Sequence, residues 1–123
     1  MIVTLTANPS LDRAVALDEA LRVGEVQVAR SVREDAGGKG INVTRVVHAA
    51  GRESVAVLPL DADDPFAGAL RAAHVPAVAV PLAGSARANL TLTDGAGVTT
   101  KINLPGVERT AADGAALIAA VVS

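Results

Sequence analysis

Several residue types are scarce or missing in this chain, and each absence narrows its chemistry. The 123 residues include no cysteine, and His48 and His74 are the only histidines. Disulfides and thiolate metal sites are therefore excluded, and we expect no transition-metal site, because such sites draw mainly on cysteine and histidine. A chain without cysteine suits a reducing compartment, so we expect a cytoplasmic protein.

Aromatic side chains are almost absent, with no Trp, no Tyr and one Phe. Nucleic acid is not an expected partner, because bases have no aromatic platform to stack on and the formal net charge of −2 lacks a basic excess. The N-terminus has no basic stretch before a long apolar run, and no run of about eighteen apolar residues occurs. We therefore expect neither secretion nor a membrane span.

Short apolar runs alternate with amphipathic segments along the chain. Strands are expected at 2–6, 54–60 and 75–82, and helices at 40–50, 65–74 and from 110 onward. Pro76 and Pro81 indicate that the last of these strands is short or lies at an edge. The alternation predicts a layered α/β fold with a parallel sheet, and a hydrophobic share of 50% is ample for its core.

Other apolar positions predict how these elements face the core. Two more strands are expected at 15–17 and 25–32, and the second has valines at alternating positions, which predicts an apolar face. The helix positions expected to face inward are Ile41, Val43, Val46, Val47 and Ala50, then Phe66, Ala69, Leu70 and Ala73, then Leu117, Ile118 and Val121.

The segment AGGKGINV at 36–43 is the most informative motif. Its glycines let the backbone bend tightly just before an apolar helix, so N–H groups, a lysine and an amide can face an anion. A turn that merely begins a helix is the simpler alternative. A nucleotide P-loop needs Ser or Thr where Gly40 stands, and the dinucleotide fingerprint needs a small residue where Val43 stands. Neither ATP nor NAD is predicted at this turn.

Motifs on both sides of this turn make the chain resemble a known family. They are TANPSLD at 6–12, GGKGINV at 37–43, RAN at 87–89 and TKINLPG at 100–106. In this order they resemble the phosphofructokinase B (PfkB) family of carbohydrate kinases, most closely its 1-phosphofructokinase and tagatose-6-phosphate kinase subgroup. The resemblance implies a ribokinase-like three-layer α/β/α fold. It also implies a small lid over the sugar site, with strands at about 13–33 and 86–104.

Members of that family are much longer and carry their catalytic aspartate in a Gly-Ala-Gly-Asp motif of the C-terminal half. Here Gly95-Ala96-Gly97 is followed by Val98, and the segment from Asp94 is typical of a hairpin turn. The resemblance therefore implies that residues 1–123 are the N-terminal part of a single kinase domain, with no catalytic residue of their own. ATP and Mg²⁺ are expected for the full-length enzyme, and neither is expected to bind this chain alone.

The lid hairpin has polar and apolar residues at alternate positions, which allows its register to be predicted. We expect Leu92 opposite Val98, Leu90 opposite Thr100, Asn89 opposite Lys101 and Arg87 opposite Asn103. One face then gathers two cations and two amides, which suit a phosphate and sugar hydroxyls. A solvated strand face is the simpler alternative.

The resemblance implies a set of substrate-binding residues. They are Asp12, Gly37, Gly38, Lys39, Asn42, Arg87, Asn89, Lys101 and Asn103. Asp12 is expected to accept hydrogen bonds from sugar hydroxyls, Asn42 to hold a hydroxyl, and the two glycines to let backbone N–H groups approach the sugar. Lys39 could meet either the phosphate of the substrate or the phosphoryl group in transfer.

Other polar residues have simpler explanations. Arg45 and His48 are expected to be surface or packing residues, although they lie three residues apart on one helix face. The acidic run Asp61, Asp63 and Asp64 is expected to cap a helix, and so is Thr110 with Asp113.

These observations predict ATP-dependent phosphorylation of a sugar phosphate, of the type that converts fructose 1-phosphate to fructose 1,6-bisphosphate. This chain would supply the sugar-binding part. The alternatives are a sugar-phosphate-binding module without catalysis and an interaction protein with an exposed sheet edge. A homodimer through the lid, or association through that edge, is also expected.

Overall fold

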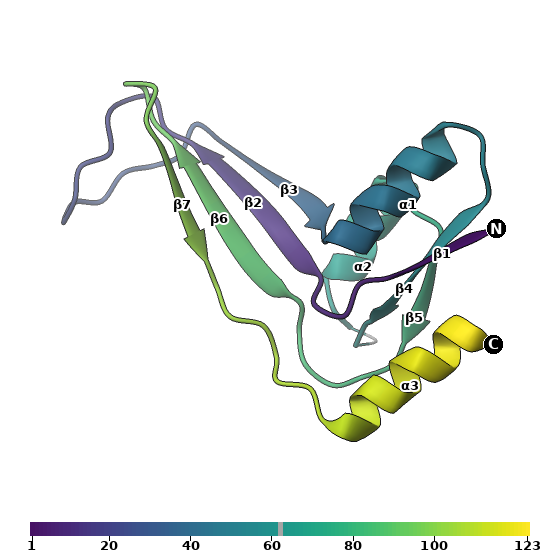
Figure 1. The fold of residues 1–123 in the computed structure, drawn as a ribbon. Helices are drawn as coiled ribbons and strands as arrows, with labels where there is room; N and C mark the ends of the chain where they lie inside the picture. The colour runs from purple at the N-terminus through teal and green to yellow at the C-terminus, as the bar shows by residue number, and fades with distance from the viewer. Residues whose placement is uncertain (62) are drawn as a thin grey trace.

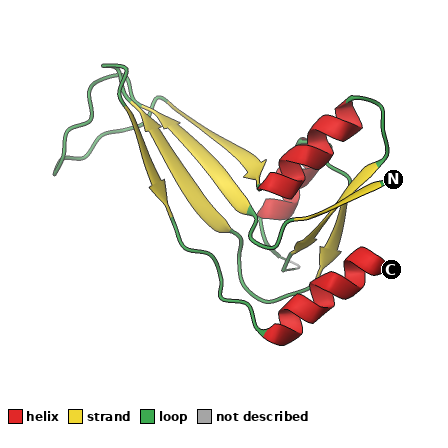
Figure 2. Cartoon of the chain, viewed as in Figure 1, coloured by secondary structure: helices red, strands yellow, loops and turns green. Residues whose placement is uncertain are grey.

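The computed structural model describes residues 1–61 and 63–123, and this part of the chain forms two β-sheets and three helices (Figures 1 and 2). The strands are β1 (Ile2–Leu5), β2 (Ser10–Ala16), β3 (Ser31–Gly37), β4 (Ser54–Pro59), β5 (Ala77–Val80), β6 (Arg87–Thr93) and β7 (Thr99–Asn103). The helices are α1 (Lys39–Ala49), α2 (Phe66–Ala72) and α3 (Ala111–Val122). No helix in the described ranges is long and apolar enough to cross a membrane.

The first sheet is parallel, with strand order β1-β4-β5, and it lies between α1 and α2 on one side and α3 on the other (Figure 1). Alternation along β4 explains the two layers, because Ala56 and Leu58 pack in a cluster with α1 and α2 whereas Val57 packs with Leu117 of α3. The predicted three-layer α/β/α fold is therefore confirmed, and β5 is an edge strand of this sheet, as expected.

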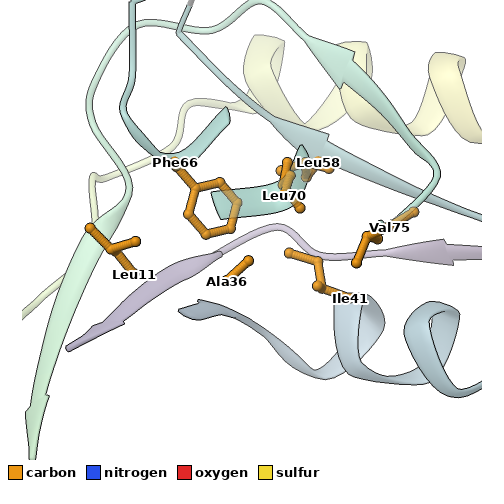
Figure 3. Packing of buried hydrophobic residues seen from close by; sticks show 8 residues of the cluster. Leu11, Ala36, Ile41, Leu58, Phe66, Leu70 and Val75 are labelled. Carbon is orange, nitrogen blue, oxygen red and sulfur yellow. The ribbon is translucent and has the colours of Figure 1, made fainter. Parts of the chain in front are cut away.

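The main core lies where α1, α2 and β4 meet. Ile41, Leu58 and Phe66 are fully buried, and Figure 3 shows these side chains gathered with Leu11, Ala36, Leu70 and Val75. Leu11 and Ala36 belong to β2 and β3, so this cluster anchors the second sheet to the body. Burial of a side chain of this size contributes about 1.5–3 kcal/mol.

The inward-facing positions of two helices were predicted only in part. In α1, Ile41 is buried, but Val43 and Val46 are 49% and 67% exposed, and Thr44 takes an inner position instead. Thr44 can lie inside because its hydroxyl hydrogen-bonds to those of Thr4 (2.7 Å) and Ser54 (3.0 Å). In α3 the prediction was wrong for Ile118, which is exposed, while Leu117 is buried.

The ends of the helices follow the predicted capping chemistry. Gly51, which follows the C-cap residue Ala50 of α1, has φ of 80°, and the side chain of Asp64 accepts the N–H of Phe66 at the start of α2. Thr110 and Asp113 form the expected capping box of α3, at 3.1 and 3.0 Å.

The second sheet, which we call the lid sheet, has strand order β3-β2-β6-β7 and projects away from the body (Figure 1). Strands β2 and β6 are parallel, and the two outer pairs are antiparallel. The strand predicted at 25–32 was wrong, since β3 begins at Ser31 and both Val26 and Val28 are more than 90% exposed. A loop forms here instead, held by the side chain of Gln27, which accepts from the N–H of Arg22 at 2.7 Å and donates to the carbonyl of Ala20 at 3.1 Å.

The predicted register of the lid hairpin was also wrong, by two residues. Asn89 lies opposite Asn103, Leu90 opposite Ile102, Thr91 opposite Lys101 and Leu92 opposite Thr100. The reason is the turn. The carboxylate of Asp94 accepts the N–H groups of Ala96 and Val98, both at 3.0 Å, and the N–H of Asp94 donates to the carbonyl of Val98 at 3.1 Å, so Val98 lies opposite Asp94 and not opposite Leu92. A shift of two residues preserves the faces, so Arg87, Asn89, Lys101 and Asn103 still share one side.

Candidate functional site

The candidate site begins at the glycine turn between β3 and α1. Gly37 ends β3, and a Cβ there would overlap the carboxylate of Asp12, so only glycine lets this acid lie against the turn. Gly38 has φ of 138°, which strongly favours glycine, and a Cβ on it would press on Thr6. The hydroxyl of Thr6 accepts the N–H of Ile41 at 3.0 Å and so fixes the start of α1 to the end of β1.

A polar row crosses all the strands of the lid sheet. The register places Asp35, Asp12, Asn89 and Asn103 side by side on β3, β2, β6 and β7. Directly opposed residues point to the same face, so the row forms one polar surface. Asn89 Nδ2 donates to Asp12 Oδ1 at 3.4 Å, and the buried Ser10 hydroxyl donates to the same oxygen at 2.8 Å.

Two polar atoms on this surface are buried without a hydrogen-bond partner in the described part of the chain. They are Arg87 Nε, a donor, and Asn89 Oδ1, an acceptor. Most buried polar groups in proteins are satisfied, so each such atom indicates a missing partner. A phosphate oxygen would satisfy the guanidinium, and a sugar hydroxyl would satisfy the amide oxygen.

Two hollows flank the polar row. The larger, about 550 Å³, is lined by Asp12, Arg13, Ala14, Arg33, Asp35, Ala36, Asn42 and Arg45. The smaller, about 250 Å³, is lined by Leu5, Thr6, Ala7, Asn8, Gly38, Lys39, Gly40 and Arg87. We call these the Asp12 hollow and the Lys39 hollow. Each joins the start of α1 to the lid sheet, one through Asn42 and the other through Lys39.

The structure brings most of the predicted site residues to this corner. Asp12 and Asn42 line one hollow and Gly38, Lys39 and Arg87 the other, while Gly37 and Asn89 contact Asp12. The exceptions are Lys101 and Asn103, which are exposed on β7 and line neither hollow. They share the polar face of the lid sheet at its outer edge.

Several residues at the site were missed by sequence reasoning. Arg45 was set aside although its spacing from Asn42 places it on the same helix face, and Arg45 Nη2 donates to Asn42 Oδ1 at 3.2 Å. Ser10 lies two residues before Asp12 on the same strand face, which is also a readable signal. Arg33 and Asp35, paired at 3.0 Å, could be placed only once the pairing of β2 with β3 was known.

The far end of the lid sheet is tied together by Asp94. Its carboxylate accepts the N–H of Leu21 at 3.0 Å, and this bond joins the 17–30 loop to the turn between β6 and β7. The backbone N–H groups of Leu21, Val98 and Ala96 hold the pKa of Asp94 below its usual value of 3.8, because each favours the charged carboxylate. This carboxylate therefore links the tips of both lid hairpins.

A layered α/β body with a β lid whose polar face meets a glycine turn is the arrangement of the ribokinase-like sugar kinases. Solved structures agree with this class. Phosphofructokinase-2 from Escherichia coli in complex with fructose-6-phosphate matches with a TM-score of 0.85 and 27% identity, over 98% of this chain and 41% of that one. The tetrameric inhibited form of the same enzyme matches with a TM-score of 0.80 and 25% identity, over 94% and 39%.

Curated relatives carry names from the same group of kinases. The chain is 38% identical over 109 residues to the 1-phosphofructokinase of Xanthomonas campestris, which is 86% of this chain and 34% of that enzyme. It is 37% identical over 95 residues to the ATP-dependent 6-phosphofructokinase isozyme 2 of Mycobacterium tuberculosis, which is 76% of this chain and 28% of that enzyme. No model of a known protein family matches the chain.

These similarities show that the chain is homologous to the PfkB carbohydrate kinases and shares their ribokinase-like fold, as its motifs indicated. It spans 34% to 36% of the length of the first two curated relatives.

Proposed function

We propose that this chain forms the sugar-phosphate-binding part of an ATP-dependent ketohexose-phosphate kinase. The reaction would be of the type that converts fructose 1-phosphate to fructose 1,6-bisphosphate. Residues 1–123 would be the N-terminal part of a single kinase domain, with β2, β3, β6 and β7 as its lid.

The single observation that carries this proposal is the pair of buried unpartnered atoms on the polar face of the lid sheet. Arg87 Nε needs an acceptor and Asn89 Oδ1 needs a donor, and both belong to the polar face of the lid sheet. A phosphorylated sugar supplies both, because its phosphate accepts and its hydroxyls donate. An apolar ligand would supply neither.

The geometry also suggests how the acceptor sugar would be held. Asp12 would accept from a sugar hydroxyl, and its carboxylate is fixed by Ser10 and Asn89 on one oxygen. The glycine turn at residues 37 and 38 lets backbone atoms lie against the ligand without a Cβ in the way. Lys39 and Arg87, which share a hollow, would neutralise phosphate charge from two directions.

We propose that ATP and Mg²⁺ serve the full-length enzyme and that their binding groups lie outside this chain. When bound, they would supply and neutralise the transferring phosphoryl group. In the described ranges, no group of three or more acidic or histidine residues could hold a metal ion. The motif Gly95-Ala96-Gly97 is followed by Val98, so it lacks the aspartate that the resemblance leads one to expect at that position. Because the proposed reaction uses ATP and the chain has no cysteine, we place it in the cytoplasm.

Binding of fructose 1-phosphate to the chain, followed by calorimetry, tests this function. We expect saturable binding that weakens about tenfold to a hundredfold in Arg87→Ala and in Asp12→Ala, since each removes a charged hydrogen-bonding group. Arg71→Ala, which truncates an exposed arginine of α2, is the matched control and should leave affinity unchanged. A folded chain that binds neither fructose 1-phosphate nor fructose 6-phosphate would overturn the proposal.

A second measurement tests whether this chain alone can catalyse phosphoryl transfer. With ATP, Mg²⁺ and fructose 1-phosphate, we expect no sugar-dependent release of ADP by this chain alone. Robust turnover would show that the chain carries its own catalytic base.

We further propose that the lid pairs with a second copy of the chain. Opposite the polar face, Val32 and Ile102 are 55% and 46% exposed, and the nearby loop adds exposed valines. Covering such apolar surface favours association. Sedimentation should show a dimer that dissociates in Val32→Lys with Ile102→Lys, but not in Val78→Lys on β5 of the body. Dissociation in Val78→Lys instead would favour pairing through the sheet edge.

A further inference from the structure

We propose that Arg45 is a positioning residue of this site, which turns the carboxamide of Asn42 so that it donates a hydrogen bond to the ligand. This inference rests on the proposed sugar-phosphate site. It gives a role to an arginine whose sequence pattern indicated only a surface or packing position.

The contact between the two side chains sets the direction of the amide. Arg45 Nη2 donates to Asn42 Oδ1 at 3.2 Å. A guanidinium has donors and no acceptor, so it binds the oxygen end of the carboxamide and leaves the Nδ2 end free for another partner. The main chain holds Asn42 in place as well, because its N–H donates to the carbonyl of Gly38 at 2.9 Å.

The orientation of the Asn42 amide matters for a ligand in the Asp12 hollow, because Asn42, Arg45 and Asp12 all line this hollow. The carboxylate of Asp12 only accepts hydrogen bonds, and an Asn42 amide fixed by Arg45 donates them. A sugar hydroxyl in this hollow would donate to Asp12 and accept from Asn42. If the amide were reversed, two acceptors would face that hydroxyl and one would lack a proton.

The ion pairs around the Asp12 hollow do not involve Arg45, so its guanidinium can bind Asn42. Arg13 pairs with Glu34 at 3.2 Å and Arg33 pairs with Asp35 at 3.0 Å. In the described ranges, no carboxylate forms an ion pair with Arg45, and its observed hydrogen bond is the one to Asn42.

A double-mutant cycle tests the coupling between the two residues. We expect Asn42→Ala and Arg45→Ala each to weaken binding of fructose 1-phosphate about tenfold, and the double variant to bind no more weakly than Asn42→Ala. Arg45→Lys should restore part of the affinity, because an ammonium can donate to the same oxygen. Arg71→Ala is again the control. Losses that multiply in the double variant would overturn the proposal.

A readout without ligand separates this inference from the proposed function. The side-chain amide signals of Asn42 in a ¹⁵N-correlated spectrum of the free chain should shift in Arg45→Ala and stay unchanged in Arg71→Ala. Unchanged signals in Arg45→Ala would overturn the inference even if sugar phosphates bind. Shifted signals in a chain that binds no sugar phosphate would support the contact and refute the proposed function.

Discussion

The body and the lid sheet are both built from short strands, yet different interactions hold them in place. In β4 of the body, five of six residues are buried, whereas all five residues of β7 in the lid sheet are exposed. Packing therefore positions the body and, through Leu11 and Ala36, the base of the lid sheet. Backbone ladders and turn hydrogen bonds position the outer strand and the tips of the lid sheet. The polar side chains proposed to bind the ligand lie on the lid sheet and at the glycine turn, and not in the apolar core of the body.

The largest difference between the two regions is expected from core truncation. Phe66→Ala should lower the free energy of unfolding by about 3–5 kcal/mol, because it empties a fully buried position. Urea denaturation measures the change in unfolding free energy. Phe66→Leu should lower it less than Phe66→Ala, because leucine leaves a smaller cavity. Ile102→Ala in β7 should cost under about 1 kcal/mol, since that side chain is half exposed. Equal losses in the two regions would contradict the contrast.

A smaller effect is expected where the lid meets the body, at Gly37. Gly37→Ala should displace the carboxylate of Asp12, because the added Cβ overlaps it. We expect binding of fructose 1-phosphate to weaken about tenfold or more, with a loss of about 1–3 kcal/mol in unfolding free energy. Retained affinity would show that Asp12 does not need its observed position.

Gly114 in α3 gives the opposite expectation. Apart from its chain neighbours and the backbone of its own helix, no atom lies within 4 Å of a Cβ built there. Gly114→Ala should therefore raise the stability of the body by about 0.5–1 kcal/mol. Thermal and urea unfolding provide the measurement. A lower stability would mean that α3 needs a glycine for close packing, which the observed space does not indicate.

The smallest effect should be a pH dependence confined to the lid tips. The pKa of Asp94 is lowered in the folded state, so its contribution to stability is present above about pH 4 and is lost as the pH falls through the folded value. The difference in urea midpoint between wild type and Asp94→Asn should therefore be constant at neutral pH and shrink below pH 4. A difference that does not change with pH would show that backbone N–H groups do not stabilise the charged form.

Local patterns in the sequence were sufficient for much of the body. Apolar runs predicted buried parallel strands at 2–6 and 54–60, and both strands form. Burial is confirmed for β4, but the prediction was wrong for β1, whose Ile2, Val3 and Leu5 are exposed. The caps at Asp64 and Thr110 depend on neighbouring residues alone. The motif positions of Asp12, Asn42 and Arg87 could also be named in advance, because their order along the chain resembles a known family.

Positions that depend on pairing between distant segments could not be derived in this way. Val26 and Val28 alternate like a strand, but β2 pairs with residues 31–37, and their loop is held by Gln27. The hairpin register was set by the hydrogen bonds of Asp94, which no hydrophobic pattern reports. Whether an apolar stripe such as Val43 and Val46 is buried depends on what packs against it.

The amino-acid sequence alone thus determined where the helices and the parallel strands of the body form, because capping and periodicity depend on residues that are close together in the chain. Only the folded arrangement placed Asp12 against Gly37 and Asn89, brought Arg45 to Asn42, and left Lys101 outside both hollows. The physical reason is that a binding surface is made by side chains from different elements, and their distances follow from sheet register and helix docking.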